Sequence, residues 1–390
     1  MKTVAIIAIS VGVFFVGIGV SYAIFTSTYD PNTMKFHNQE LFDQMMSQNP
    51  KMMANWMETM MQDPQTMQQM MGMMGQGIIP EKESVMLHPE KMTSASPLPD
   101  VARGPAIDFT KGYLVEEIRD GLYWVTEGAY NTIFLTTGEG VIVVDAPPTI
   151  GENYLKAIAE VTDEPITHVI YSHTHRDHIG AASMFPNDAV IIAHEETASQ
   201  LEQRNDPNRP VPTVTFEDKY TLEVGNQKLE LEYHGPVHEP GNIFIYAPNQ
   251  KVLMLVDIVF PGWSPFKDLA MAEDVPYFLA AHDKILEYNF DTYVGGHLTR
   301  LGTSEDVKIQ KEYFQDIQEN AALANQQADF MAIAQEVGFE NPWLIFQIYA
   351  DSITQQCTDE TVSKWVDKLG AVDLFTYDHC WKISESQRID

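Results

Sequence analysis

Short apolar runs, which are typical of buried β-strands, recur between residues 107 and 305 of the chain. Several of these runs end at a side chain that can bind a metal or transfer a proton. An aspartate follows each of the runs at 141–144 and 253–256, and the run at 167–171 leads into a polar loop and then a predicted helix. The pattern predicts one large α/β domain with polar groups at its strand ends.

The amino-terminal pattern is different, because residues 4–25 are uncharged and mostly apolar. A run of this length can span a bilayer. With Lys2 before it and Asp30 as the first charge after it, the run is expected to place the rest of the chain outside the cytoplasm. We expect a membrane anchor within residues 1–30. The small residues Ser21 and Ala23, on either side of Tyr22, form a small-x-small pattern and offer the alternative of a cleaved signal peptide and a secreted protein.

Residues 31–75 are rich in methionine and predict a helical segment, which a linker at 76–106 joins to the next domain. Asn49 and Asp63 each precede a proline, as at the start of a helix. The segment resembles the Met-rich repeats of ubiquilin-type co-chaperones, where flexible thioethers line an adaptable groove. Binding of Cu(I) and a simple amphipathic spacer near the membrane are the alternatives.

Residues 306–390 have a helical pattern and predict a carboxyl-terminal extension. The stretch 308–337 contains no proline and is followed by Gly338, and Pro342 starts a second stretch. The apolar residues at 343–349 are expected to pack beside the mouth of the active site or against a second subunit of a homodimer.

Cys357 and Cys380 are the only cysteines of the chain, and both lie in this extension. In an exported protein the default expectation is a disulfide that clamps the extension. A metal-binding role is a weaker alternative, because the two cysteines are far in sequence from the candidate metal ligands described below. A redox role is also weaker, because the cysteines lack the Cys-x-x-Cys spacing.

The composition limits the partners of the protein. The 390 residues include 24 Lys plus Arg and 55 Asp plus Glu, which gives a net charge of -31. Such an acidic surface repels nucleic acid, and we expect no nucleic-acid partner. A small-molecule substrate is expected instead, and a highly anionic one is disfavoured unless bound metals reverse the local potential.

The sequence His173-Thr174-His175-Arg176-Asp177-His178 carries the most specific chemistry of the chain, with three imidazoles and a carboxylate in one loop. In an extended loop the first two histidines point the same way, because their spacing is two residues. Asp177 and His178 are adjacent and diverge. One loop can therefore supply ligands to two neighbouring metal ions.

Three later segments can complete the two coordination shells. His238 lies between turn residues, Asp257 follows an apolar strand, and His297 ends the strand that contains Gly295 and Gly296. The order of these ligands resembles that of the metallo-β-lactamase superfamily over about residues 114–302. The combined motif is specific, whereas each later piece by itself is weak.

The resemblance implies seven metal ligands, three for each of two ions and one that bridges them: His173, His175 and His238; Asp177, His178 and His297; and Asp257. His234 is the alternative to His238, but His238 matches the family pattern Gly-x-x-His-x-x-Gly, with Glu239 in place of the usual Ser or Thr. The ions would be two Zn²⁺, with Fe or Mn as alternatives. Asp145 resembles the buried aspartate that supports the histidine loop, and a simple strand cap is the other interpretation.

The resemblance further implies a four-layer αβ/βα sandwich and a metal-dependent hydrolase. A hydroxide that bridges the metals would be the nucleophile. Asp177 would orient it and shuttle a proton.

Asp257 favours the ester- and lactone-cleaving branches, because antibiotic-hydrolysing members lack a bridging aspartate. Phe260 departs from the lactonases, which carry a tyrosine at this position. Trp263, Phe266 and Tyr277 predict a pocket for an apolar group. A β-lactamase, an iron-dependent oxidoreductase similar to persulfide dioxygenases and a Met-rich, membrane-tethered binding protein are the alternative functions.

Overall fold

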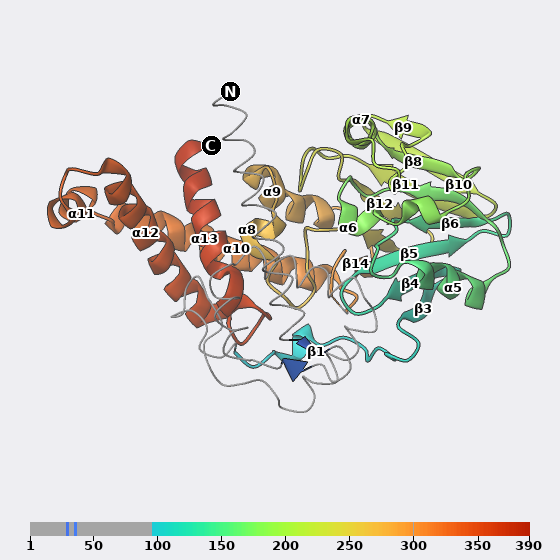
Figure 1. The fold of residues 1–390 in the computed structure, drawn as a ribbon, viewed down its shortest axis with the longest axis horizontal. Helices are drawn as coiled ribbons and strands as arrows, with labels where there is room; N and C mark the ends of the chain where they lie inside the picture. Colours follow the sequence, from blue (N-terminus) through green and yellow to red (C-terminus); the bar gives the residue numbers. More distant parts are fainter. Residues whose placement is uncertain (1–28, 31–34, 37–95, 299) are drawn as a thin grey trace, which may run out of the picture. The chain divides into compact units, whose positions relative to one another are not determined.

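The computed structural model describes residues 29–30, 35–36, 96–298 and 300–390 (Figure 1). The chain divides into two units, Met1–Thr93 and Ser94–Asp390. In the first unit, β1 (Tyr29–Asp30) pairs antiparallel with β2 (Lys35–Phe36). The predicted membrane anchor and most of the Met-rich segment and linker lie outside the described residues. Among the residues that are described, none forms a helix long and apolar enough to cross a membrane.

Two β-sheets form the centre of the second unit. The first sheet is seven-stranded and follows chain order, from β3 to β9. Its strands are β3 (Leu114–Arg119), β4 (Leu122–Thr126), β5 (Asn131–Thr136), β6 (Val141–Val144), β7 (Ile166–Ile170), β8 (Val190–His194) and β9 (Val214–Phe216). Strands β3 to β6 pair antiparallel, and β6 to β9 pair parallel. Parallel pairing requires crossover connections, and the histidine loop lies in one of them.

The second sheet is five-stranded and also follows chain order. Its strands are β10 (Lys219–Val224), β11 (Gln227–Glu232), β12 (Phe244–Ala247), β13 (Val252–Met254) and β14 (Thr292–Val294). Only β13 and β14 pair parallel, so both of them end at the same edge of this sheet. Asp257 and His297 follow these two strands.

The helices lie between and after the strands. They are α5 (Glu152–Val161), α6 (Arg176–Ile179), α7 (Glu195–Arg204), α8 (Lys267–Ala270), α9 (Val275–Leu286), α10 (Ser304–Gln327), α11 (Phe330–Val337), α12 (Pro342–Trp365) and α13 (Val372–Ile389). Figure 1 shows α10 to α13 gathered on one side of the unit.

Three hydrophobic clusters show the order of the layers. Ile142 of the first sheet and Leu231 of the second sheet share the cluster between the two sheets. Tyr154 of α5 packs in a cluster on the other face of the first sheet. On the second sheet, Leu253 joins a cluster with the carboxyl-terminal helices that includes Phe314. The predicted α/β sandwich with a helical carboxyl-terminal region is therefore confirmed.

The carboxyl-terminal region departs from the predicted pattern at residue 328. The proline-free stretch 308–337 is not one helix, because α10 ends at Gln327 and α11 begins at Phe330. The carboxylate of Asp329 caps α11 by accepting hydrogen bonds from the backbone N–H groups of Met331 and Ala332. An aspartate that caps a new helix ends the preceding one without a proline or glycine.

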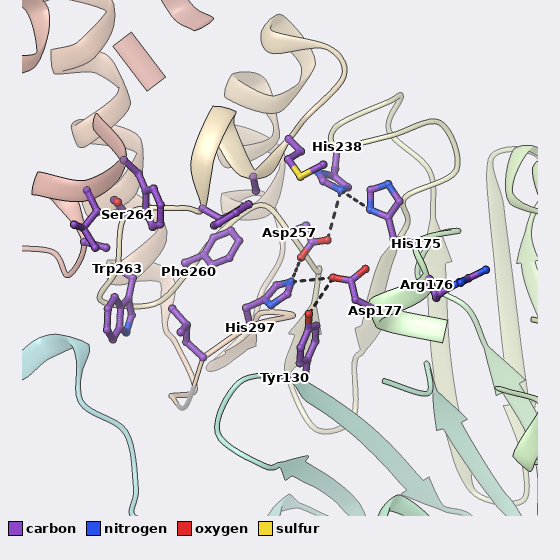
Figure 2. Close-up of a pocket in the computed structure, with 17 residues that line it drawn as sticks. Tyr130, His175, Arg176, Asp177, His238, Asp257, Phe260, Trp263, Ser264 and His297 are labelled. Carbon is purple, nitrogen blue, oxygen red and sulfur yellow. Dashed lines mark hydrogen bonds and ion pairs between the residues drawn. The ribbon is translucent and has the colours of Figure 1, made fainter. Parts of the chain in front are cut away.

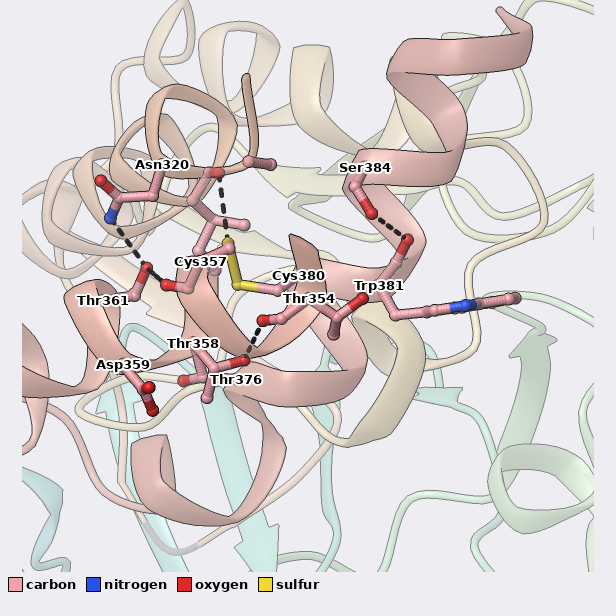
Figure 3. Close-up of a disulfide and its surroundings, with 12 residues drawn as sticks. Asn320, Thr354, Cys357, Thr358, Asp359, Thr361, Thr376, Cys380, Trp381 and Ser384 are labelled. Carbon is pink, nitrogen blue, oxygen red and sulfur yellow. Dashed lines mark hydrogen bonds between the residues drawn. A yellow bond between two sulfur atoms is a disulfide. The ribbon is translucent and has the colours of Figure 1, made fainter. Parts of the chain in front are cut away.

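The predicted disulfide is present. Cys357 of α12 and Cys380 of α13 are bonded and fully buried, with an S–S distance of 2.03 Å (Figure 3). The bond ties together the last two helices of the chain.

The apolar segment at 343–349 does not reach the pocket described below. Trp343 is 79% exposed and Leu344 is 45% exposed. Ile345 is buried within this segment, and the other buried residues of α12 include Ile353, Cys357 and Trp365, farther along the helix. Packing against a second subunit remains a prediction for the exposed end of α12.

Helix α8 begins an unusual turn. Four consecutive non-glycine residues, 268–271, have positive φ angles between 54° and 63°. Their backbone is therefore left-handed, and we call these residues the left-handed turn. Each such residue costs about 1–2 kcal/mol relative to a right-handed helix, so the surrounding structure must hold the turn in place.

Candidate metal centre

The histidine loop has the predicted position between a strand and a helix. It joins β7 to α6, and His175 is the amino-terminal cap residue of α6. Asp145 helps to fix the start of the loop, because its Oδ1 accepts a hydrogen bond of 2.7 Å from the backbone N–H of Ser172. Asp145 follows β6, is fully buried and has a φ of 55°. The geometry fits the supporting role better than a simple strand cap.

The structure brings all seven predicted ligands into two neighbouring groups. In the first group, Nε2 of His238 lies 3.1 Å from Nδ1 of His175. Nε2 of His173 and Nε2 of His238 each lie 3.5 Å from Oδ2 of Asp257. The ligand atoms of this group all lie within 4.8 Å of one another.

The second group contains Asp177, His178 and His297, and its ligand atoms also lie within 4.8 Å of one another. Nε2 of His178 is 3.2 Å from Nε2 of His297. Oδ2 of Asp177 lies 3.7 Å from the first of these nitrogens and 3.9 Å from the second.

Asp257 lies between the two groups. Its Oδ2 is 3.1 Å from Nε2 of His178, and its Oδ1 is 3.0 Å from Nε2 of His297. Burial by itself would raise the pKa of Asp257, but His178 and His297 hold it well below its usual range. Conversely, burial lowers the pKa of His178, but the charge of Asp257 raises it to about 9. The carboxylate therefore stabilises positive charge at this point, as a bound cation requires.

The donor set fits two divalent cations. Five imidazoles and two carboxylates suit zinc, iron or manganese. Nε2 of His173 is buried and has no hydrogen-bond partner among the described residues, as expected for an atom that serves as a ligand. Burial, followed by the neighbouring His178 and His175, lowers the pKa of His173 well below its ordinary value, so the imidazole is neutral. The neutral form is the one that binds a metal.

Glu239 supports the first group from outside. Its Oε1 accepts 2.7 Å hydrogen bonds from both the backbone N–H and the hydroxyl of Thr174. Its Oε2 lies 3.2 Å from Nε2 of His175, the ring nitrogen that does not face His238. A carboxylate at this place fixes the orientation and tautomer of a metal-binding histidine. The sequence showed only that Glu239 departs from the family pattern and did not predict this contact.

Three further histidines, at 194, 234 and 282, have ordinary structural roles. Nε2 of His234 lies 2.9 Å from the hydroxyl of Tyr288 and 3.1 Å from Oε2 of Glu232, so His234 is outside both ligand groups. His194 caps α7, and His282 lies buried in α9.

A pocket of about 630 Å³ opens over the ligands (Figure 2). His175, Asp177, His238, Asp257 and His297 line one half of it. The apolar half of the pocket is formed by Phe260, Trp263, Phe266, Ala270, Met271, Leu298, Ala371, Leu374 and Phe375.

Of the three aromatic residues that predicted an apolar pocket, Trp263 and Phe266 line it and Tyr277 does not. Tyr277 lies at the start of α9 and is 46% exposed. The sequence also missed Leu374 and Phe375 of α13. These two residues follow the predicted ligands by many positions, and no local pattern connects them with the site.

Tyr130 is another lining residue, and its hydroxyl donates a hydrogen bond of 3.3 Å to Oδ2 of Asp177. Burial, followed by the negative charge of Asp177, raises the pKa of Tyr130 above its ordinary value. The phenol therefore stays protonated and can act as a hydrogen-bond donor.

Residues 125–304 match the model of the metallo-beta-lactamase superfamily. This part of the chain belongs to that superfamily. The match includes all seven predicted ligands.

Three curated relatives are similar to this chain. The α subunit of 2,4-dinitroanisole O-demethylase from Nocardioides sp. (strain JS1661) is 29% identical over 52% of the chain and 62% of the relative. A metallo-beta-lactamase type 2 of Elizabethkingia meningoseptica is 28% identical over 40% of the chain and 65% of the relative. A linear primary-alkylsulfatase of Pseudomonas sp. (strain ATCC 19151) is 22% identical over 44% of the chain and 42% of the relative. The chain thus spans less than two thirds of each of these relatives.

Proposed function

We propose that the protein is a dinuclear metal-dependent hydrolase that cleaves an ester, lactone or related bond in a small molecule with an apolar group. The position of Asp257 carries the proposal, because its carboxylate faces both ligand groups. Its Oδ2 lies 3.5 Å from Nε2 of both His173 and His238 in the first group. In the second group, its Oδ1 lies 3.0 Å from Nε2 of His297 and its Oδ2 lies 3.1 Å from Nε2 of His178. One carboxylate shared by two groups of imidazoles is the arrangement expected of a two-metal site. Zinc is the proposed metal, and iron and manganese accept the same ligands.

The bound ions would lower the pKa of a water molecule to near neutrality and polarise the bond under attack. The residues of the chain have three further tasks. The Asp177 carboxylate, whose side chain is 45% exposed, can orient the nucleophile and accept its proton. The protonated Tyr130 hydroxyl can donate a hydrogen bond to an oxygen that gains charge. The apolar half of the pocket excludes water from the substrate.

The pocket supports a substrate with an uncharged alkyl or aryl part. Arg176 is the only Lys or Arg among the lining residues, and its side chain is 71% exposed. The alkylsulfatase and the O-demethylase among the relatives are named for substrates that contain an alkyl chain or an aromatic ring. A carboxylic ester, a lactone, a thioester and an alkyl sulfate all fit this description.

Removal of an alkyl group from an aryl ether is a second candidate activity. It is favoured by the O-demethylase relative, which is named for a methoxy-substituted aromatic compound. The aromatic residues Phe260, Trp263 and Phe266 can stack on such a ring.

The test combines metal analysis with a substrate panel. The purified protein is assayed with p-nitrophenyl octanoate, an alkyl lactone, an acyl thioester, an alkyl sulfate, 2,4-dinitroanisole and a chromogenic β-lactam. We expect about two divalent ions per chain and the highest kcat/KM on an ester or lactone, with none of this activity in Asp257→Ala. A higher kcat/KM on the β-lactam than on every ester and lactone would overturn the substrate class.

We also propose that the catalytic domain lies outside the cytoplasm, tethered by residues 4–25 or secreted after their removal. The Cys357–Cys380 disulfide supports this location, because such bonds persist in oxidising compartments. Protease treatment of intact cells should remove the domain, and its full protection would contradict the proposed topology.

A further inference from the structure

The left-handed turn is part of the apolar half of the pocket. Ala270 and Met271 both line it, and both have positive φ angles, of 54° and 63°. The turn is closed by backbone hydrogen bonds from Ala270 N–H to the oxygen of Phe266 and from Met271 N–H to the oxygen of Lys267. A right-handed turn of the same residues would present different side chains to the substrate.

The turn depends on a contact from α13, because non-glycine residues do not hold this conformation unaided. Nδ1 of His379 accepts a hydrogen bond of 3.1 Å from the backbone N–H of Leu269. Nε2 of the same ring donates one of 3.0 Å to the carbonyl oxygen of Pro265. Lys382, one turn later on α13, donates to the carbonyl oxygen of Ala272. Both sides of the left-handed turn are therefore attached to one helix.

His379 is suited to this role because it is fully buried and stays neutral. Burial lowers its pKa to about 3. A neutral imidazole with one nitrogen accepting and the other donating matches the two backbone groups that it meets.

The same helix supplies the facing side of the pocket. Leu374 and Phe375 of α13 line the pocket, and the rings of Phe375 and Phe266 have centroids 5.3 Å apart. One helix thus provides two apolar side chains directly and positions Met271 through the left-handed turn.

We propose that His379 is a positioning residue that sets the specificity of the pocket for extended, uncharged alkyl or aryl groups. It holds the left-handed turn in the conformation that places Ala270 and Met271 against the substrate. The inference rests on the proposed function for its substrate class. A change of His379 should affect the binding of the apolar part of the substrate and not the binding of the metals, because His379 lies outside both ligand groups.

The test uses His379→Gln and compares p-nitrophenyl acetate with p-nitrophenyl octanoate. We expect the ratio of kcat/KM for octanoate over acetate to fall at least about tenfold, through a higher KM for octanoate. The metal content and the rate on acetate should stay near the wild-type values. An unchanged ratio in a folded, metal-loaded variant overturns the proposal.

His194→Gln is the matched control. Nδ1 of His194 also accepts a backbone hydrogen bond, from Glu196, and Nε2 faces the carbonyl oxygen of Glu217 at 2.6 Å. His194 is buried but does not line the pocket. An equal fall of the ratio in this variant would show a general effect of losing a buried histidine and would overturn the specific role.

A rescue variant tests the backbone conformation itself. Asp268 has a φ of 56° and does not line the pocket. Glycine adopts this conformation at no steric cost, so Asp268→Gly added to His379→Gln should restore part of the preference for octanoate. No restoration would argue against the left-handed turn as the link.

If His379→Gln does not fold, Lys382→Met decides the question, because it removes the other contact of α13 with this loop. Lys382→Met should lower the ratio of kcat/KM for octanoate over acetate as well, and an unchanged ratio overturns the proposal.

Binding of N-phenyl-1-naphthylamine, followed by fluorescence, separates this inference from the proposed function. If the wild type hydrolyses none of the esters, the proposed hydrolase function is wrong. If the wild type and His379→Gln bind the probe with equal affinity, the positioning role of His379 is wrong.

Discussion

At the residue scale, the third histidine of the first ligand group distinguishes two interpretations of the sequence. The structure places His238 next to His175 and pairs His234 with Tyr288 and Glu232. We expect His175→Ala and His238→Ala to lose metal and activity, and His234→Ala to keep both. Metal content per chain, measured after gel filtration, checks this. If His234→Ala empties the site and His238→Ala does not, the ligand assignment is wrong.

Glu239 is expected to tune metal affinity through His175. Glu239→Gln should weaken metal binding about 10- to 100-fold in a competition titration with a chelator, because the variant lacks the charge beside Nε2 of His175. Glu232→Gln is the matched control, since Glu232 pairs with His234 in the same way, at 3.1 Å. Equal metal affinity in both variants would contradict the role of Glu239.

Phe260 is the position at which this chain departs from the lactonases. It is buried, lines the pocket and stacks on His297 with ring centroids 5.7 Å apart. A tyrosine here would add a hydroxyl donor in the pocket. We expect Phe260→Tyr to preserve or raise lactone turnover, because loss of one such donor elsewhere costs about 10²-fold or more. Collapse of lactone turnover with the metals still bound would count against this placement.

At the scale of elements, α13 does more than the sequence pattern indicates. It is bonded to α12 through Cys357 and Cys380, it carries Leu374 and Phe375 into the pocket, and it holds the left-handed turn through His379. A disulfide that keeps this helix in place stabilises the fold and the pocket together.

Replacing both cysteines by serine is therefore expected to lower the free energy of unfolding. The two cysteines are separated by 23 residues, and loop closure of this length corresponds to about 3 kcal/mol. Urea unfolding of the double variant and of the wild type, with and without reductant, measures the difference. Equal midpoints for the oxidised wild type and the double variant would show that packing alone holds α13.

At the scale of the whole molecule, the buried neutral histidines make the domain sensitive to acid. Burial lowers the pKa of His379 to about 3, so between its ordinary value of 6.5 and about 3 the unfolded chain binds a proton that the folded chain does not. Stability therefore falls as the pH is lowered through this window. Lys382 on the same helix is the charged group that also lowers this pKa.

The size of this effect can be isolated by comparison with His379→Gln. From pH 6.5 to pH 5 the wild type should lose about 1.6 kcal/mol more unfolding free energy than the variant. Urea titrations at both pH values give the two differences. Parallel losses in the two proteins would mean that His379 is protonated without cost to the fold.

The sequence by itself determined the α/β class, the helical carboxyl-terminal region, the disulfide and the group of residues that form the candidate metal site. The α/β class and the helical region follow from local patterns, whereas the disulfide follows from the presence of only two cysteines in a chain expected to be exported. The ligand set follows from the resemblance of its ligand order to the metallo-β-lactamase superfamily. Apolar runs mark strands, and polar residues directly after them meet at one edge of the sandwich. The two-residue spacing of His173 and His175 places both on one side of their loop.

Only the tertiary structure decided what surrounds the ligands. The contact of Glu239 with His175, the place of Leu374 in the pocket and the bond from Leu269 to His379 join residues that are far apart in sequence. The left-handed turn contains no glycine, so the sequence does not indicate its conformation. The contacts with α13 stabilise this conformation, which its own residues do not favour. Local spacing fixes which residues share a loop or a strand end, whereas packing between distant elements fixes which side chains enclose the substrate.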